Sequence, residues 1–170
     1  MQVGPREGLV AQWLLKNVAT ASTSRVLCID TSVSDLASTM VSADTETMRR
    51  DLELRLAPFK DRVEVIVGRS QEILREISAD YYERVDLVYV SGSQMASDVL
   101  EDVVLAFRLL RKYGVMVIDG VEAHPFGGNP LLEPKLGVTA FRAVFAGQYE
   151  SIYEGEQLVL RKVRSGPDAM

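Results

Sequence analysis

The chain has 170 residues, of which 47% are hydrophobic and 25% are charged, and its formal net charge is −5. This size and composition are typical of one globular domain, so we expect residues 1–170 to form a single domain. Acidic and basic side chains are interspersed, which argues against a basic face for nucleic acid. The apolar runs are too short to span a bilayer, and the chain does not open with the pattern of a secretory signal peptide. We therefore expect a cytoplasmic protein with no nucleic-acid or membrane partner.

The single cysteine, Cys28, lies in the apolar run RVLCID. It has no second cysteine with which to form an internal disulfide, and a thiol buried in a strand is expected rather than a reactive one. The chain also contains only one histidine. A zinc site built from the usual cysteine and histidine ligands is therefore not expected.

The chain opens with the stretch MQVGPREGLVAQWLL, a glycine turn followed by an apolar helical pattern. Such a turn usually follows a buried strand, but here residues 1–3 leave room only for a truncated first strand. Gly4 and Gly8 would let the backbone approach a ligand, and the helix start would direct free N–H groups toward it. The third glycine of a dinucleotide-binding fingerprint is missing, so an ordinary turn and helix start remain an equal alternative.

Four later segments are rich in Val, Ile and Leu with little alternation, which predicts strands buried on both faces: residues 25–30, 62–68, 85–92 and 114–120. Helical periodicity predicts helices between them, at residues 8–18, 45–59, 70–78 and 96–113, of which the second is closed by Pro58. Trp13 and Phe107 stand among the apolar positions of these helices and are expected in the core. The Ser/Thr-rich residues 31–47 predict a surface loop or a poorly formed helix.

The last part of the chain has a different pattern. Residues 122–134 contain three prolines and two glycines and predict a loop, which a helix over 133–148 follows. Two extended runs, 149–155 and 156–163, meet at a turn and predict an antiparallel hairpin, and residues 164–170 predict a frayed tail. The whole order predicts an α/β fold: a Rossmann-like, doubly wound sheet that is mostly parallel, with an antiparallel C-terminal hairpin.

Ligands of doubly wound sheets bind beyond the carboxyl ends of the strands, so polar residues at that edge are candidates for a site. Asp30 ends the second predicted strand, at the spacing from Gly8 expected of a carboxylate that holds a ribose. Its alternative is a helix cap or a loop position. Ser70, in the stretch GRSQEIL, is suited to cap the next helix or to contact an adenine ring, and capping alone would explain it.

A second group of polar residues follows the next two strands. Ser91, Ser93, Gln94 and Asp119 are expected to converge where a transferred group would lie. Asp119 could bind a cation or orient a substrate, or be a solvated aspartate at a strand end. His124 is the only side chain there whose ordinary pKa suits proton transfer near neutrality, and its alternative is an exposed loop residue.

The order and spacing of these segments resemble the class I S-adenosylmethionine-dependent methyltransferases, and among them the small O-methyltransferase-type domains of bacterial natural-product and sugar clusters. The resemblance runs from Gln2 to about Val163. QVGPREGLVAQWLL resembles the E-I-G-x-x-x-G cofactor loop, and RVLCIDT resembles the second strand with its ribose acid. The stretch from VDLVYVSGSQ to YGVMVIDG resembles Y-I-D-G-S-H followed by a helix and then P-G-G-V-hydrophobic-D-D.

This resemblance implies a seven-stranded sheet whose last strand is antiparallel, and a methyl transfer to the hydroxyl of a small acceptor such as a sugar or natural product. Carried over by position, the cofactor-binding residues would be Gly4 and Gly8 at the methionine part, Asp30 at the ribose, Arg69 and Ser70 near the adenine, and Ser91. Asp119 and His124 would be the catalytic residues, with His124 as the base.

The sequence also departs from the family pattern. Gln2 replaces the acid of the cofactor loop, Ser91 and Gln94 replace the aspartate and histidine of Y-I-D-G-S-H, and Gly120 replaces the second aspartate of the D-D pair. Only Asp119 remains of the acids that hold a divalent metal in metal-dependent relatives, and one carboxylate would bind such an ion weakly, so no metal ligand is assigned.

These departures keep other interpretations open. One is a catalytically impaired, methyltransferase-like binding or assembly domain, and another is a different nucleotide-binding protein such as an NAD-dependent enzyme. A homo-oligomer is also possible, because an exposed sheet edge beside the truncated first strand would favour pairing with another chain.

Overall fold

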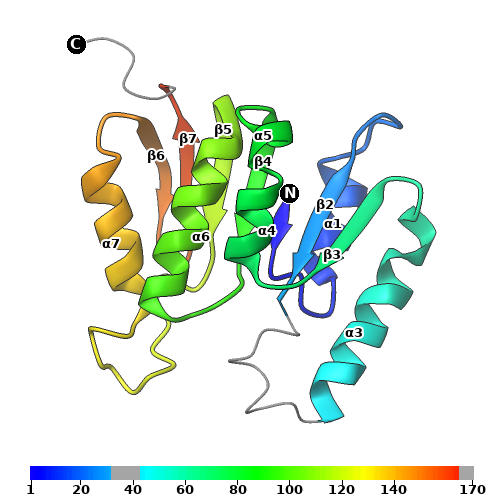
Figure 1. Ribbon diagram of the computed structural model, residues 1–170, viewed down its shortest axis with the longest axis horizontal. Helices are drawn as coiled ribbons and strands as arrows, with labels where there is room; N and C mark the ends of the chain where they lie inside the picture. The colour runs from blue at the N-terminus through cyan, green and yellow to red at the C-terminus, as the bar shows by residue number, and fades with distance from the viewer. Residues whose placement is uncertain (32–42, 165–170) are drawn as a thin grey trace. The chain divides into compact units, whose positions relative to one another are not determined.

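The computed structural model describes residues 1–31 and 43–164, which fall into two compact units, Met1–Ile73 and Leu74–Met170 (Figure 1). Most of the predicted loop over 31–47 and nearly all of the predicted tail lie outside the described residues. The single domain over residues 1–170 stays a prediction. No helix in the described ranges is both long and apolar enough to cross a bilayer.

The first unit contains three parallel strands in the order β3-β2-β1. Its elements are β1 (Gln2–Val3), α1 (Leu9–Asn17), β2 (Val26–Asp30), α3 (Ala43–Leu56), a short 3-10 helix η1 (Ala57–Phe59), β3 (Val63–Val67) and the start of α4 (Ser70–Glu76). β1 has only two residues, which confirms the truncated first strand. Pro58 lies in η1, directly after α3, so the predicted stop of that helix is also confirmed.

The core of the first unit lies where α1 and α3 pack against β2. Ala11 and Leu15 of α1, Cys28 of β2, and Leu52 and Leu56 of α3 are all buried in it. Cys28 is therefore the buried strand thiol that the sequence predicts, and burial raises its pKa to about 11. A thiol held in the neutral form is a poor nucleophile.

Two predictions for the first unit are wrong. Trp13 is 56% exposed, because α1 turns Ala11, Leu14 and Leu15 toward the core and leaves Trp13 on another side of the helix. Strand β3 is not buried on both faces, since Val65 and Val67 are 38% and 42% exposed. β3 lies at the end of the order β3-β2-β1, where it has a single strand neighbour and fewer side chains around it.

The second unit has the strand order β4-β5-β7-β6. Its elements are α5 (Ser78–Tyr81), β4 (Val85–Val90), α6 (Ala96–Leu109), β5 (Leu110–Ile118), α7 (Pro134–Val144), β6 (Tyr149–Glu154) and β7 (Leu158–Lys162). β4 pairs with β5 in parallel, whereas β7 pairs antiparallel with both β5 and β6. The mostly parallel, Rossmann-like α/β fold with an antiparallel C-terminal hairpin is thus confirmed.

Helix α6 ends earlier than predicted, at Leu109 rather than Tyr113, and β5 begins with the next residue. The reason is that other groups take the backbone carbonyls at its end. Backbone N–H groups of Glu83 and Arg84 donate to the carbonyls of Arg108 and Leu109, and the Lys162 ammonium donates to those of Phe107 and Leu110. Carbonyls satisfied in this way do not need a continued helix.

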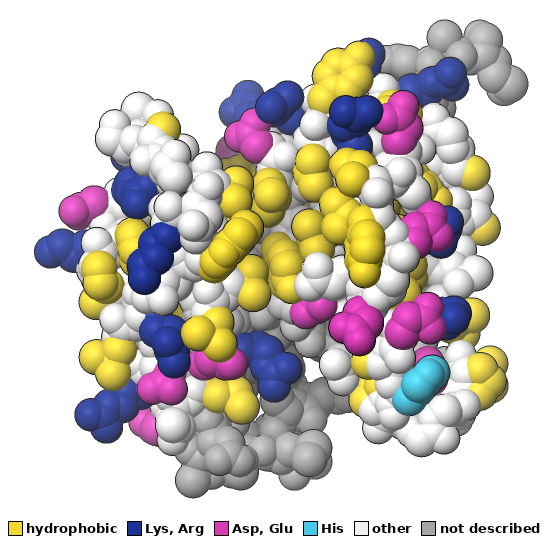
Figure 2. Space-filling view, turned by 180° about the vertical axis from the view of Figure 1, so that it is seen from behind, with side chains coloured by type: hydrophobic (Ala, Val, Ile, Leu, Met, Phe, Trp, Pro, Cys, Tyr) yellow, Lys and Arg dark blue, Asp and Glu magenta, His cyan; other side chains and the backbone are white. Residues whose placement is uncertain are grey.

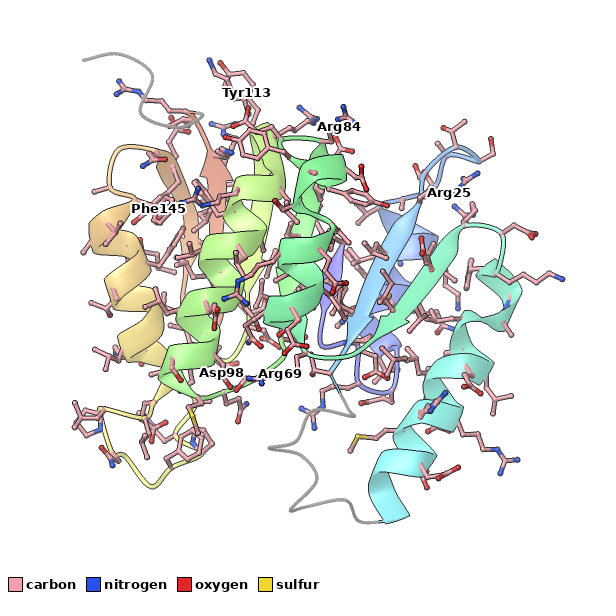
Figure 3. The ribbon with its side chains drawn as sticks, viewed as in Figure 1. Arg25, Arg69, Arg84, Asp98, Tyr113 and Phe145 are labelled. Carbon is pink, nitrogen blue, oxygen red and sulfur yellow. The ribbon has the colours of Figure 1, made fainter. Side chains whose placement is uncertain are left out.

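Helices α6 and α7 pack closely on the same face of the second unit (Figure 1). The Phe107 ring of α6 lies edge-on to those of Phe141 and Phe145, with ring centroids 5.3 and 5.2 Å away, and the Phe141 ring also stacks on that of Tyr149. Figure 3 labels Phe145, just beyond the end of α7. Gly137 lies at the crossing. A β-carbon there would be 3.0 Å from the Leu100 amide nitrogen and closer still to the Ala96 carbonyl oxygen.

We expect Gly137→Ala to lower the free energy of unfolding by about 2–3 kcal/mol, because the backbone of α6 cannot move aside for the new methyl group. If Gly137 did not contact α6, the same change would stabilise the helix by about 1 kcal/mol. The sign of the change in the free energy of unfolding therefore shows whether the two helices are in close contact. Urea unfolding followed by circular dichroism measures it. Thr139→Ala, on the exposed side of α7, is the matched control and should change stability little. A Gly137→Ala variant as stable as the wild type would contradict the close crossing.

Candidate functional site

The turn between β1 and α1 has the geometry of a ligand-binding loop. Gly4, Arg6 and Gly8 all have positive φ, at 75°, 50° and 84°. The Gly4 N–H donates to the Ile29 carbonyl at 2.9 Å, which ties the turn to β2, and the Gly8 N–H donates to the Pro5 carbonyl at 2.8 Å. Positive φ is strained at a non-glycine residue such as Arg6, and strain of this kind gathers at functional sites.

Gly8 is the N-cap of α1, and no side chain caps the helix there. Its own carbonyl accepts the N–H of Gln12 at 2.9 Å, but the first N–H groups of α1 have no partner within the helix. Gly8 also has a packing role that the sequence did not reveal. A β-carbon at this position would lie 2.9 Å from Leu52 Cδ1 of α3.

The next two strands of the first unit end beside this turn. The registers pair Val3 with Ile29 and Asp30 with Val67, so the carboxyl ends of β1, β2 and β3 meet at one edge. Asp30 is only 4% exposed, and its backbone carbonyl accepts the Gly68 N–H at 3.0 Å. The structure therefore brings the glycine turn, Asp30 and the start of α4 together.

Arg69 and Ser70 lie at the start of α4, directly beyond β3 (Figure 3). The Arg69 carbonyl accepts the Ile73 N–H at 3.1 Å, which makes Arg69 the residue that flanks the helix and Ser70 its first helical residue. Ser70 therefore does not occupy the N-cap position of α4, and its position does not indicate a capping role. Ser70 is buried, whereas the Arg69 side chain is half exposed and lies 3.8 Å from Glu72.

Gln2, in β1, is a further polar residue of the first unit. It is 1% exposed, and its side-chain oxygen Oε1 accepts no hydrogen bond from the described residues. A buried acceptor without a donor is costly, typically by about 1–3 kcal/mol. Gln2 Oε1 is therefore available to a donor from outside the described residues.

In the second unit, the ends of β4 and β5 hold the other predicted residues. The Asp119 N–H donates to the Val90 carbonyl at 2.9 Å, so Asp119 lies beside the strand end that Ser91 follows. Gln94 is also near, since a β-carbon at Gly120 would lie 3.7 Å from Gln94 Nε2. Ser93 is occupied locally, because its hydroxyl donates to Asp98 Oδ2 at 2.9 Å at the start of α6.

The structure adds two residues to Asp119 that the sequence analysis missed. The Gln157 side-chain amide donates to Asp119 Oδ1 and to the Tyr89 hydroxyl, both at 2.9 Å. Burial, and then the negative charge of Asp119, raise the pKa of Tyr89 to about 12. Gln157 comes from the hairpin and is 38 residues from Asp119 in sequence. No local pattern signals that contact.

His124 comes five residues after Asp119 in the chain. It is exposed in the loop after β5, and within the described residues its ring makes no hydrogen bond. The same loop closes on Glu133, whose buried carboxylate accepts the Gly128 N–H at 2.9 Å. Across the described ranges, no three side chains of His, Cys, Asp or Glu are grouped so that they could hold a metal ion.

A family model described as a methyltransferase domain matches residues 1–121. No curated protein sequence matches the chain.

Solved structures share the fold at low identity. The O-methyltransferase TomG from Streptomyces achromogenes, involved in tomaymycin synthesis and solved with SAM, is 22% identical with a TM-score of 0.67, over 96% of this chain and 72% of that one. The O-methyltransferase from Bacillus cereus, solved with SAH, is 20% identical with a TM-score of 0.67 over the same shares. A spermidine synthase from Thermotoga maritima is 16% identical with a TM-score of 0.55, over 98% of this chain and 52% of that one.

The spermidine synthase shows that this fold serves more than one activity, so likeness of fold alone does not assign the chemistry. The family match is more specific. It spans well over half of the chain, from the glycine turn through Asp30 to Asp119. The resemblance to class I S-adenosylmethionine-dependent methyltransferases is thus confirmed, and the chain belongs to the family of methyltransferase domains.

Proposed function

We propose that this protein is a methyltransferase that uses S-adenosylmethionine and transfers the methyl group to a hydroxyl of a small acceptor, such as a sugar or natural product. One observation carries the proposal. Three consecutive parallel strands of the first unit end at one edge with a positive-φ glycine turn, a buried aspartate and a helix start. This is where Rossmann-like sheets bind nucleosides.

Each part of the cofactor has residues of suitable chemistry. The turn at Gly4 and the uncapped start of α1 after Gly8 suit the methionine part, and Asp30 suits the two ribose hydroxyls, which are hydrogen-bond donors. Arg69 and Ser70 lie next along the same edge, on the adenine side. Ser91, beyond β4, is the remaining cofactor-binding residue that we propose.

Gln2 stands where the family pattern has an acid, so its surroundings show whether the site still suits the cofactor. Its buried Oε1 needs a donor, and the ammonium group of the methionine part is one. The neutral amide replaces an ion pair by a hydrogen bond to a charged group, which is still a favourable interaction. When bound, S-adenosylmethionine supplies a methyl group on a sulfonium, and the protein supplies mainly alignment.

Asp119 and His124 are the catalytic residues that we propose on the acceptor side. Gln157 and Tyr89 hold the Asp119 carboxylate, so that it can orient the acceptor hydroxyl. His124 would accept the proton of that hydroxyl, whose oxygen would take the methyl group as the bond from methyl carbon to sulfonium sulfur breaks and leaves a neutral thioether. The loop over 122–134 carries His124 and is the segment that would select the acceptor.

A second candidate function is a methyltransferase-like binding or assembly domain without catalysis. The changes at Gln2, Ser91, Gln94 and Gly120 favour it, because each replaces an acid or a histidine of the family pattern. Cofactor binding separates the two candidates, since a domain that has lost the pocket would not bind S-adenosylhomocysteine.

We expect the purified chain to bind S-adenosylhomocysteine with micromolar affinity in calorimetric titration, both with and without magnesium. Asp30→Ala should weaken binding about 10- to 100-fold, because the ribose loses charged hydrogen bonds worth about 1.5–3 kcal/mol. Asp61→Ala, at an exposed aspartate of the same unit, is the control. Unchanged affinity in a folded Asp30→Ala variant would overturn the ribose assignment.

His124→Ala should lower the rate of methyl transfer by about 100-fold or more, because general-base catalysis contributes about that much. The affinity of the His124→Ala variant for S-adenosylhomocysteine should equal that of the wild type. Transfer of a radiolabelled methyl group to an acceptor found by screening small hydroxylated molecules measures the rate. Undiminished transfer by His124→Ala would remove this residue from the mechanism.

Asp119→Asn should lower the pKa of Tyr89 from about 12, because the neutral amide removes the negative charge next to the hydroxyl. The pKa should stay above its ordinary value, since burial is the larger cause. Ultraviolet absorbance of tyrosinate as a function of pH measures the change, with Tyr89→Phe to identify the signal. Asp86→Asn, at an exposed aspartate of β4, is the control. A Tyr89 titration that does not move would contradict the contact.

A further inference from the structure

The loop over 122–134, which joins β5 to α7, has no apolar core of its own. The structure describes every residue from 122 to 132, and none of them is buried. Figure 1 shows this loop in yellow, extending beyond the end of β5. His124 lies in it, and the histidine is exposed at the surface of the protein (Figure 2). Because few apolar contacts hold such a loop, its shape depends on hydrogen bonds.

Glu133 is buried at the base of this loop, directly before α7. It is only 3% exposed, although glutamates rarely lie buried unless they are paired. It is the N-cap residue of α7, but its side chain does not cap the helix. Instead, its Oε1 accepts the Gly128 N–H at 2.9 Å, and its own N–H donates to the Asn129 carbonyl at 3.2 Å. Glu133 therefore binds the middle of the loop through both its side chain and its backbone.

Two consecutive glycines give the loop the turn that Glu133 holds. Gly127 and Gly128 have positive φ, at 66° and 80°. A β-carbon at either position would meet no heavy atom within 4 Å, so these glycines are needed for backbone conformation rather than for space. The Gly127 N–H donates to the His124 carbonyl in a long hydrogen bond of 3.4 Å. The turn that carries His124 and the contact to Glu133 are thus adjacent along the backbone.

The base of the loop is itself fixed. The Leu132 carbonyl accepts the Ala96 N–H of α6 at 2.9 Å, so the residue next to Glu133 is attached to α6. A second contact, between Lys135 and Glu122 at 2.8 Å, also links α7 to the loop. Its two side chains are 58% and 47% exposed, and exposed ion pairs contribute little. The buried, charge-assisted hydrogen bond of Glu133 is the stronger of the two links.

We propose that Glu133 is a positioning residue of the acceptor site: its carboxylate fixes the turn at Gly127 and Gly128, and this turn fixes the place of His124. The proposal rests on the proposed function, because it takes His124 as the base. Glu133 acts through the backbone of the loop and takes no part in the proton transfer. A displacement of about 1 Å at a reacting group can lower a rate about 100-fold, so the place of His124 would matter.

Two variants of Glu133 separate the hydrogen bond from the size of the side chain. Glu133 Oε2 is buried and accepts no hydrogen bond from the described residues. Glu133→Gln therefore keeps the acceptor for the Gly128 N–H and loses no hydrogen bond at the second position. Glu133→Met has a side chain of similar size, which limits any loss of packing, but its thioether is only a weak acceptor. Glu76→Met, at an exposed glutamate of α4, is the matched control.

Magnetic resonance of the full chain, without cofactor or acceptor, tests the positioning directly. The chain has one histidine, so the His124 ring gives a signal that no other histidine overlaps. Glu133→Met should shift or broaden this signal. It should also raise the rate of amide hydrogen exchange at Gly128 about 10-fold or more, because it removes a hydrogen bond to a charged group. Glu133→Gln and Glu76→Met should leave the His124 signal in place and keep the Gly128 amide protected.

Methyl-transfer rates test whether the positioning acts through His124. Glu133→Met should lower kcat about 10- to 100-fold, because the base is displaced, and should leave the affinity for S-adenosylhomocysteine unchanged. Glu133→Gln should retain most of the wild-type kcat. In a chain that already carries His124→Ala, Glu133→Met should cause no further loss, because residues that act together do not have additive effects.

Three results would overturn the proposal: a His124 signal and a Gly128 exchange rate that Glu133→Met leaves unchanged, a Glu133→Gln variant that behaves like Glu133→Met, or an equal loss of kcat from Glu133→Met with and without His124→Ala. Failure of the proposed function has different signs, namely no binding of S-adenosylhomocysteine or undiminished transfer by His124→Ala alone. The magnetic resonance results depend on neither, so the two failures are distinguishable.

Discussion

Lys162 is only 3% exposed, and three parts of the second unit converge on its side-chain ammonium. It donates to the carbonyls of Phe107 and Leu110 at 3.2 and 2.7 Å and to the Glu83 carboxylate at 3.1 Å, and it lies 5.1 Å from the centre of the Phe107 ring. A buried cation must be satisfied in this way, because an unpaired one would cost several kcal/mol. The contact therefore fixes where α6 ends, where β5 begins and where β7 lies.

The acceptor side of the proposed site depends on the position of Lys162 as well. Once β7 is held beside β5, the antiparallel register pairs Ile118 with Leu158. The residues that follow and precede this pair, Asp119 and Gln157, then meet at 2.9 Å. The same register places Val117 opposite Val159. A single buried ammonium thus helps to align the proposed catalytic carboxylate.

The first unit keeps the family pattern more closely than the second. Its glycine turn, buried Asp30 and uncapped α1 carry the proposed cofactor site, and only Gln2 differs in charge from the pattern that the sequence resembles. In the second unit, Ser91, Gln94 and Gly120 stand where the pattern that the sequence resembles has ionisable groups, and Gln157 and Tyr89 are the partners of Asp119. The two units would thus contribute in different ways. The first would bind the cofactor mainly through backbone geometry, whereas the second would act on the acceptor through side chains that depart from the family pattern.

The sequence by itself determined the elements whose signals are local. Strand composition placed β2 and β4, the glycine turn marked the start of α1, and the extended runs around Gly155 predicted the hairpin, because a few neighbouring residues decide each of these. Tertiary structure decided the rest. Trp13 is exposed because a different side of α1 packs against the core. Helix α6 ends at Leu109 because donors far away in the sequence bind the backbone carbonyls at its end. The register between β5 and β7 places Gln157 within hydrogen-bond distance of Asp119. Contacts between residues far apart in the chain leave no periodic trace in it, so only the folded structure shows them.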